Sequence, residues 1–271
     1  MTKGGIAGDV WPRVVLPSVV GRPRPELLQL NLGFKTSYVG EEAQSKRGAL
    51  ALTSPIEGAT VRDLAMELLW EHTFQALHLA PEGHSILLTE TPSNPPPDKE
   101  KSLQVMFEAF GFSAASVAPQ PLLSLYASGR TTGCVIDIGD GAGHCVACSS
   151  GRLLPHSTTP LGYSGSDLTA SMARMLRERG YSFPAPAERD LARDIKEKLC
   201  RVALDFEGEL EMMMHSLEKS YELPDGQVIT VGGEVLRCPE GLFWPESLGV
   251  ESKGIPERVI GIGERVRKEL E

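Results

Sequence analysis

Two aspartates and three glycines lie between two apolar runs near the middle of this chain. Gly139, Gly141 and Gly143 alternate with other residues just after Asp137, and Asp140 lies among them. Glycine gives the backbone the freedom of a tight turn, which can point several N–H groups into a concavity that holds phosphate oxygens. Two carboxylates would repel a bare phosphate, so a divalent cation must lie between them and the ligand. The turn predicts a Mg-nucleotide loop.

The flanking residues predict that this turn joins two strands. Cys134, Val135 and Ile136 form an apolar, partly β-branched run before the turn, and a second apolar run follows it. The Asp-Gly pair in the turn is also typical of an ordinary hairpin without a ligand. From spacing alone, both interpretations stay open.

The cysteines predict reduced thiols. The chain has five, an odd number at irregular spacing, which is typical of a cytosolic protein. Cys145 and Cys148, next to His144, could indicate zinc or redox chemistry. Residues three apart on a strand face opposite sides, however, so the two sulfurs should not chelate one ion. We expect a structural role.

Composition excludes several classes of protein. The chain has 271 residues, 41% of them hydrophobic, which is enough for one large core or two smaller ones. Its net charge of −9 argues against a nucleic-acid binder, whose affinity needs clustered Lys and Arg. No apolar run is long enough to span a membrane, and the first residues carry no signal-peptide core. We expect a cytoplasmic protein with no nucleic-acid or membrane partner.

Strand and helix signals alternate along the chain and predict an α/β fold in two lobes that join near residues 129–133. An apolar loop from Pro25 to Ser37, with Leu27, Leu28, Leu30, Leu32 and Phe34, is either a partner contact or packed on its own domain. The predicted strands are residues 4–10, 13–20 and 85–90. The predicted helices are residues 61–78, a helix capped by Asp98 and ended by Gly111, 164–179, 187–215 and 256–270. A hairpin should turn at residues 224–226.

Several longer segments closely resemble actin. They include VVLPSVVGRPRP (14–25), SYVGEEAQSKRG (37–48), RDIKEKLC (193–200), VALDFE (202–207) and SLEKSYELPDGQVIT (216–230). The resemblance covers roughly residues 3–257 and identifies the chain as an actin-like member of the actin family. It implies the actin-like ATPase fold shared with sugar kinases and chaperones, with two lobes around a nucleotide cleft. The expected lobes are 1–133, with a small subdomain at about 18–54, and 134–271, with one at about 164–250.

The resemblance also assigns site residues. It implies that Gln120 positions the attacking water, that His144 helps to polarise it, and that Asp137 faces Mg through water. The residues it implies for ATP or ADP binding are Lys3, Asp137, Gly139, Asp140, Gly141, Ala142, Gly143, Gly165, Arg193, Lys196 and Glu197.

Each of these assignments has an alternative without function. Gln120, between two prolines, could be a surface turn residue, and His144 could be an ordinary strand histidine. Arg193 and Glu197 are four residues apart and could form a solvated charge pair on a helix, worth a few tenths of a kcal/mol.

The chain departs from actin at several points. Actin has a serine after the metal-facing aspartate, where this chain has Ile138, and its histidine after Pro-Ile-Glu is absent because Gly58 follows Glu57 directly. The chain starts at the family's lysine, here Lys3, downstream of the first phosphate loop, and stops before the segment that closes over adenosine. We therefore expect a fold incomplete at both termini, with unpaired strand edges in its first sheet. Phosphoryl transfer depends on positioning, so efficient ATP hydrolysis is not expected.

These features predict an actin-like cytoskeletal or scaffold protein of the cytoplasm with a degenerate nucleotide cleft, acting through protein contacts. Actin or actin-binding proteins are the candidate partners, and ATP or ADP with Mg should bind weakly or not at all. The alternative is a polymerising, ATP-hydrolysing filament protein of the actin type. A sugar kinase or chaperone is disfavoured because residues 37–48 and 216–230 are actin-specific in character.

Overall fold

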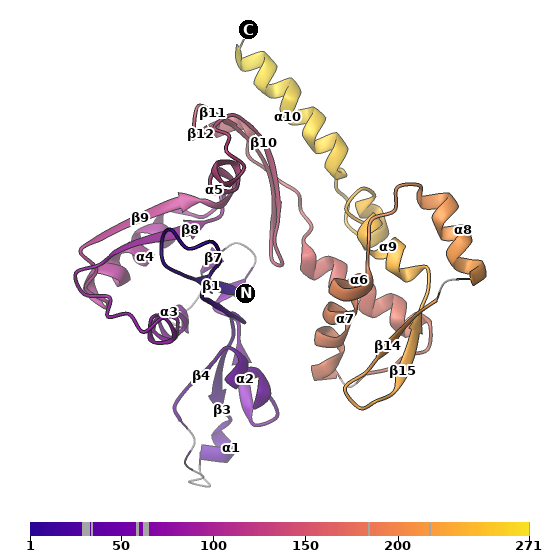
Figure 1. Cartoon of the computed structure of the whole chain (residues 1–271), viewed down its shortest axis with the longest axis horizontal. Coiled ribbons are helices and arrows are strands. Elements are labelled where there is room, and N and C mark those ends of the chain that lie inside the picture. Colours follow the sequence, from indigo (N-terminus) through magenta and orange to yellow (C-terminus); the bar gives the residue numbers. More distant parts are fainter. Residues whose placement is uncertain are drawn as a thin grey trace. The chain divides into compact units, whose positions relative to one another are not determined.

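The computed structural model describes residues 1–28, 33, 35–57, 60–61, 65–183, 185–216 and 218–270. The residues predicted as part of an apolar contact loop, Leu30, Leu32 and Phe34, lie outside this set, as do Gly58 and Leu64. The chain divides into two compact units, Met1–Gln120 and Pro121–Glu271, each with its own packing (Figure 1). The expected lobe boundary near residue 133 stays a prediction.

The first unit mixes short strands with helices. Its described strands are β1 (Thr2–Gly4), β2 (Val14–Leu16), β3 (Val20–Pro23), β4 (Tyr38–Val39), β5 (Leu50–Thr53), β6 (Ile56–Glu57), β7 (Thr60–Val61), β8 (Ser85–Glu90) and β9 (Ala114–Pro119). Its described helices are α1 (Pro25–Leu28), α2 (Glu41–Ser45), α3 (Ala65–Ala76) and α4 (Pro96–Glu108). Strands β4, β3 and β5 form an antiparallel sheet, β1 pairs with β2, β6 pairs with β7, and β8 pairs in parallel with β9.

Helix α3 organises the core of the first unit. Leu69 on α3 is fully buried and packs with Leu16 of β2 and Val20 of β3. Phe74, five residues after Leu69 on α3, makes edge contacts with the rings of Phe110 and Phe112 after α4. The buried residues of α3 recur at the spacing of one helix face. The helix predicted for residues 61–78 is therefore confirmed over Ala65–Ala76, whereas Val61 lies in β7 and residues 77–78 form a turn.

The second unit contains a sheet, a hairpin and most of the longer helices. Its described strands are β10 (Gly133–Ile138), β11 (Gly143–Ser149), β12 (Arg152–Leu153), β13 (Thr159–Pro160), β14 (Lys219–Glu222) and β15 (Val228–Val231). Its helices are α5 (Gln120–Ala127, whose first residue belongs to the first unit), η1 (Pro155–Ser157), α6 (Gly165–Glu178), α7 (Ala185–Leu199), α8 (Phe206–Ser216), α9 (Glu234–Glu240), η2 (Pro245–Leu248) and α10 (Ile255–Leu270).

Strand β11 is the centre of the second unit's sheet. It pairs with β10 on one side and with β12 and β13 on the other. Leu125 of α5 packs on one face, against Val146 and Cys148, and Ile262 of α10 packs on the other, against Cys145. Because helices cover both faces, every residue of β11 except its last is buried.

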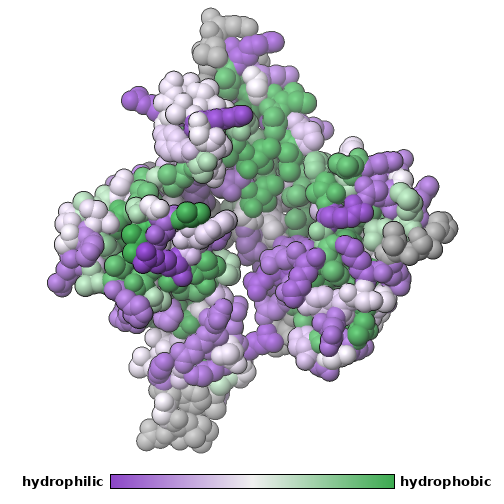
Figure 2. Space-filling view, viewed as in Figure 1, coloured by the Kyte–Doolittle hydropathy of each residue, from purple (hydrophilic) through white to green (hydrophobic). Residues whose placement is uncertain are grey.

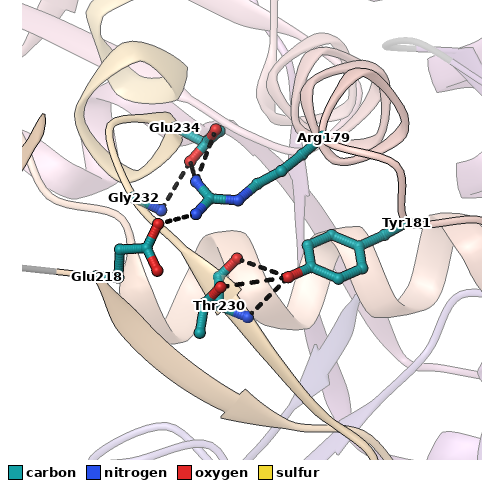
Figure 3. A network of polar contacts seen from close by, with 6 residues as sticks. All are labelled: Arg179, Tyr181, Glu218, Thr230, Gly232 and Glu234. Atoms are coloured by element: carbon teal, nitrogen blue, oxygen red, sulfur yellow. Dashed lines mark hydrogen bonds and ion pairs between the residues drawn. The ribbon is translucent and has the colours of Figure 1, made fainter.

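A separate core joins α6, α7, α9 and the β14–β15 hairpin. Met172, Ile195, Ile229 and Leu236 contribute fully buried side chains to it, one from each element. Polar contacts at the end of α6 hold the same elements together (Figure 3). There Arg179 pairs with Glu218 and, at 3.1 Å, with Glu234.

Glu234 and Tyr181 complete this polar network. The Glu234 carboxylate accepts the Gly232 N–H at 2.7 Å, and the Tyr181 hydroxyl donates to the Thr230 carbonyl at 3.2 Å and accepts the Thr230 N–H at 3.0 Å. The turn after α6 is therefore tied to β15 and to the start of α9.

Several predicted elements need correction. The strand expected at residues 13–20 is two strands, β2 and β3, which belong to different sheets, and between them the Val19 N–H donates to the Pro17 carbonyl at 2.8 Å. The strand expected at residues 4–10 ends at Gly4, because Gly8 has a φ of 98° and the Asp9 N–H donates to the Ile6 carbonyl in a turn. The helix expected at residues 187–215 is two helices, α7 and α8, since the Arg201 N–H donates to Val235 of α9 instead of continuing α7. The N-cap of α4 is Pro95, and Asp98 lies inside the first turn.

Other predicted elements are confirmed. Strand β8 spans the predicted residues 85–90, and β14 and β15 flank the predicted turn, where Gly226 has a φ of 84°. Helix α6 begins after the N-cap Ser164, and Gly180 follows it with a φ of 98°. Helix α10 begins one residue earlier than predicted.

Candidate functional site

The glycine-rich turn is a four-residue connection between β10 and β11. Asp137 faces His144 across the strand pair, and Ile138 faces Gly143 as the last pair of the ladder. The Gly139 N–H donates to the Ala142 carbonyl at 2.8 Å and closes the turn. The segment is therefore the hairpin that both open interpretations required, and other contacts must distinguish a bare hairpin from a ligand loop.

The first turn of α6 is hydrogen-bonded to this loop. The N–H groups of Gly165 and Ser166 donate to the carbonyls of Gly139 and Asp140, at 2.9 and 2.8 Å. Helix N-termini carry N–H groups with no partner inside the helix, and here the loop accepts two of them. The Asp167 carboxylate accepts the Ser164 N–H at 2.8 Å and completes the cap.

The contact between loop and helix is close enough to require glycine at position 165. A Cβ on Gly165 would lie 3.3 Å from the Asp140 Cα and 3.3 Å from the Gly139 carbonyl oxygen, both backbone atoms. Such distances are tighter than ordinary van der Waals contact, so any side chain would push the loop away from the helix. This explains physically why a glycine opens α6.

Lys196 of α7 also contacts the first turn of α6. Its Nζ donates to the Gly165 carbonyl at 2.9 Å and to the Thr169 hydroxyl at 3.0 Å, and the Thr169 hydroxyl donates to the Gly165 carbonyl at 2.9 Å. The structure thus brings Gly139, Asp140, Gly165 and Lys196 together, from three separate segments. Ser166 and Thr169 belong to the same cluster and were not predicted. Their only signal was their position in the first turns of a capped helix.

The loop also presents backbone donors. Among the residues that the structure describes, none accepts a hydrogen bond from the N–H groups of Asp140, Gly141 and Ala142. Asp140 and Gly141 are exposed, so these groups are open to solvent. Three consecutive N–H groups on a tight turn form the type of concavity that binds anions.

The acidic residues can accommodate Mg only in a water-rich site. In the described part of the chain, no group of three His, Cys, Asp or Glu side chains could hold a metal ion. Mg²⁺ usually keeps several waters and takes one or two carboxylates plus substrate phosphates. Asp137, half-buried at the end of β10, fits that limited role, which remains an expectation.

The hydrogen bonds described above for the loop, α6 and Lys196 do not involve Arg193, Glu197, Gln120 or Lys3. Arg193 is half-buried on α7 and pairs with Asp190 at 3.5 Å, and Glu197 is exposed on the same helix. Gln120 is the first residue of α5 and Lys3 lies on β1, and both belong to the first unit. The ligand roles of all four stay predictions.

His144 is buried at the start of β11, and burial lowers its pKa below the usual value, with the Asp137 charge opposing the shift. At neutral pH its imidazole is therefore uncharged. It can accept or donate a hydrogen bond but contributes no positive charge to a phosphate.

Stability should fall as the pH is lowered through and below about 6.5, the usual pKa of histidine. In that range the unfolded chain protonates His144 while the folded chain resists, so protons favour unfolding by at most about 1.4 kcal/mol per pH unit. Urea unfolding between pH 7.5 and 5 should show this loss for the wild type. The slope should be shallower for His144→Gln than for the wild type, and His156→Gln, which alters an exposed histidine of the same unit, controls for the substitution itself. Identical slopes for all three proteins would contradict the assignment.

Ile138 is directed into the protein core. It is half-buried and packs against the cluster that contains Cys145, Leu161, Tyr163 and Ile262. The residue that follows Asp137 thus packs on apolar side chains and brings no hydroxyl to the loop.

The sequence was compared with models of known protein families. The family model described as Actin matches residues 1–271.

Proposed function

This chain belongs to the actin family, with the α/β actin-like ATPase fold, and we propose that it is a cytoskeletal or scaffold protein of the cytoplasm whose nucleotide site is degenerate. It acts through contacts with other proteins, for which actin and actin-binding proteins are the candidates. No described helix has the length and apolarity to cross a membrane.

The observation that carries this proposal is the packing of Ile138. The resemblance to actin implies a serine hydroxyl here, beside the phosphates, and Ile138 instead packs on the cluster around Ile262. A hydrogen bond to a charged group is worth about 1.5–3 kcal/mol, so its loss corresponds to about 10-fold to 100-fold weaker binding. Catalysis of phosphoryl transfer depends on such positioning.

Exposed apolar residues support the role in protein contacts. Val10 and Trp11 are adjacent in the loop between β1 and β2, and 85% and 79% of their surfaces are exposed. Trp is among the residues most enriched at the centres of protein interfaces. A solvated loop that carries both is a reasonable contact for a partner.

One observation favours the alternative, an ATP-hydrolysing filament protein. The N–H groups of Asp140, Gly141 and Ala142 are available, and Lys196 and α6 hold the loop in place. Phosphate oxygens could therefore still bind, so the two functions differ in affinity and turnover rather than in the presence of a loop.

We expect Mg-ATP to bind at least about 10-fold more weakly than it binds to actin measured in parallel, with phosphate release near background. Calorimetry and a phosphate-release assay on the purified chain measure both quantities. Asp137→Ala should remove the Mg dependence of any residual binding, whereas Asp225→Ala, in the β14–β15 turn, should change nothing.

A pelleting assay with Mg-ATP, at concentrations where actin assembles, separates the two functions. The proposal expects no filaments. Tight binding, filaments by electron microscopy and turnover that Gln120→Ala abolishes would establish the alternative instead.

A further inference from the structure

Two of the five cysteines face each other across the hairpin that carries the loop. Cys134 of β10 is paired with Ala147, and Cys145 of β11 is paired with Ile136, so the two cysteines are diagonal neighbours on one face of the sheet. Their sulfur atoms are 3.7 Å apart. The Cα atoms of diagonal neighbours lie about 7–8 Å apart, at the upper end of what a disulfide spans, so side-chain rotation together with a small shift of the two strands would bring the sulfurs into bonding distance.

The third cysteine of the hairpin lies on the other face. Cys148 is three residues after Cys145 and packs with Leu125 and Val146, beneath α5. This confirms the predicted separation of Cys145 and Cys148. It also means that, of the other two cysteines in this hairpin, Cys145 is the one on the same face as Cys134.

The two thiols differ in access to solvent. Cys134 is exposed, while Cys145 is 1% exposed and lies under α10. The space-filling view shows hydrophobic residues at the surface where this hairpin lies in Figure 1 (Figure 2), and Ile136 beside Cys134 is 40% exposed. A soluble oxidant therefore reaches Cys134 first.

Burial raises the pKa of Cys145 to about 12, and the proximity of Cys134 adds to the shift. Cys145 is therefore a thiol at neutral pH and inert toward oxidants by itself. The pair thus combines an accessible sulfur with a protected one in contact with it.

We propose that Cys134 and Cys145 form an oxidisable dithiol that hydroperoxides convert into a disulfide within the β10–β11 hairpin. Cys134 attacks the peroxide oxygen, the O–O bond breaks, and Cys134 becomes a sulfenic acid as one water leaves. The Cys145 sulfur then attacks the Cys134 sulfur, the S–O bond breaks, and the oxygen leaves as a second water with the Cys145 proton. Two thiols lose two hydrogens in total, and hydrogen peroxide is reduced to two waters.

The disulfide would join the strands on either side of the glycine-rich loop. Cys134 precedes Asp137 by three residues, and Cys145 directly follows His144. The cross-link would restrict the hairpin whether or not a nucleotide binds there, so this inference is independent of the proposed function.

The test is oxidation of the reduced, purified chain with hydrogen peroxide, followed by alkylation of the remaining thiols. We expect the intact mass to fall by about 2 Da for one disulfide before alkylation. Cleavage after Arg130 and Arg152 releases one peptide that contains Cys134, Cys145 and Cys148. Further cleavage at Asp137 or Asp140 should leave the two halves joined, with Cys148 alkylated, until a reductant separates them.

Variants identify the partners. Cys134→Ser, at an exposed position, should abolish the link, and Cys148→Ser should retain it. Recovery of wild-type Cys134 as sulfinic or sulfonic acid with Cys145 alkylated would overturn the proposal. A link from Cys134 to Cys148 that Cys148→Ser removes would overturn it as well.

Discussion

Gly143→Ala is expected to destabilise the second unit by about 2–3 kcal/mol and to displace the loop. A Cβ on Gly143 would lie 2.9 Å from the Tyr163 carbonyl oxygen and 2.9 Å from the Leu161 Cδ1 atom. The carbonyl is backbone, and the Leu161 N–H donates to the Gly143 carbonyl at 2.8 Å, so neither side can move alone. Strand β11 and the segment after β13 would have to separate. Urea unfolding, compared at equal m-values, measures the loss.

Gly133→Ala is the matched control, because Gly133 lies at the far end of the same hairpin. Among the residues that the structure describes, its Cβ would meet just the Leu125 Cδ1 atom, at 3.3 Å, which is the end of a flexible side chain. We expect a change within about 1 kcal/mol. Equal losses for the two variants would show that the crowding around Gly143 is not what requires a glycine there.

Gly254→Ala should have a still larger effect, a loss of about 3 kcal/mol or more. Gly254 is buried just before α10, and a Cβ there would collide with the Phe243 carbonyl oxygen and lie 2.9 Å from its carbon. Two hydrogen bonds also hold the start of α10 against the residues that follow α9. The Ile255 N–H donates to the Leu242 carbonyl at 3.2 Å, and the Tyr163 hydroxyl donates to the same carbonyl at 3.0 Å. Displacing α10 would uncover Cys145 and Leu161. Thermal unfolding should show a midpoint lowered by about 6 °C or more.

Gly261 and Gly263, inside α10, provide controls, because alanine at these positions is expected to stabilise the protein instead of destabilising it. Apart from adjacent residues and the backbone of α10 itself, no atom of the residues that the structure describes lies within 4 Å of a Cβ built on Gly261 or Gly263, and neither glycine has a positive φ. Alanine at either position should stabilise the protein by about 0.5–1 kcal/mol, because glycine is a poor helix residue. A midpoint that falls for all three variants would indicate that α10 does not form as described.

The elements predicted correctly from the sequence are those with complete local signals. The turn at Asp225 and Gly226 uses the residue pair that hairpins prefer, and the Asp225 carboxylate accepts the Gln227 N–H at 3.0 Å. Helix α6 has a polar N-cap, and a glycine with positive φ directly follows its C-cap residue. Such features depend on neighbours within a few residues, so they can be predicted from the sequence without knowledge of the tertiary structure.

The missed features depend on contacts between distant residues. The break between α7 and α8 follows from the hydrogen bond between Arg201 and Val235, which are 34 positions apart and come together only in the folded unit. The turn at Gly8 replaced a predicted strand because apolar content alone could not locate where pairing ends. Tertiary context overrides propensity in both cases.

The loop of the candidate site could be predicted from the sequence, but most of the residues that hold the loop in place could not. Asp137 to Gly143 could be identified from residue types, and the resemblance to actin grouped Gly165 with Lys196, which the structure places in hydrogen-bond contact. Ser166 and Thr169 carried no distinctive spacing. The inward packing of Ile138 required knowledge of α10, which lies more than 100 residues later.

The hydrogen bonds of Lys196 make a mechanical connection between two helices. Lys196 belongs to α7, and its Nζ donates a hydrogen bond to the Gly165 carbonyl at the start of α6. The N–H groups of Gly165 and Ser166 in turn donate to carbonyls of the loop. Rotation of α7 about its axis would therefore pull on the start of α6 and, through it, on Gly139 and Asp140. The β14–β15 hairpin packs on α7 through the core around Ile195 and Ile229. A protein that binds the hairpin could thus transmit force to the loop without touching it.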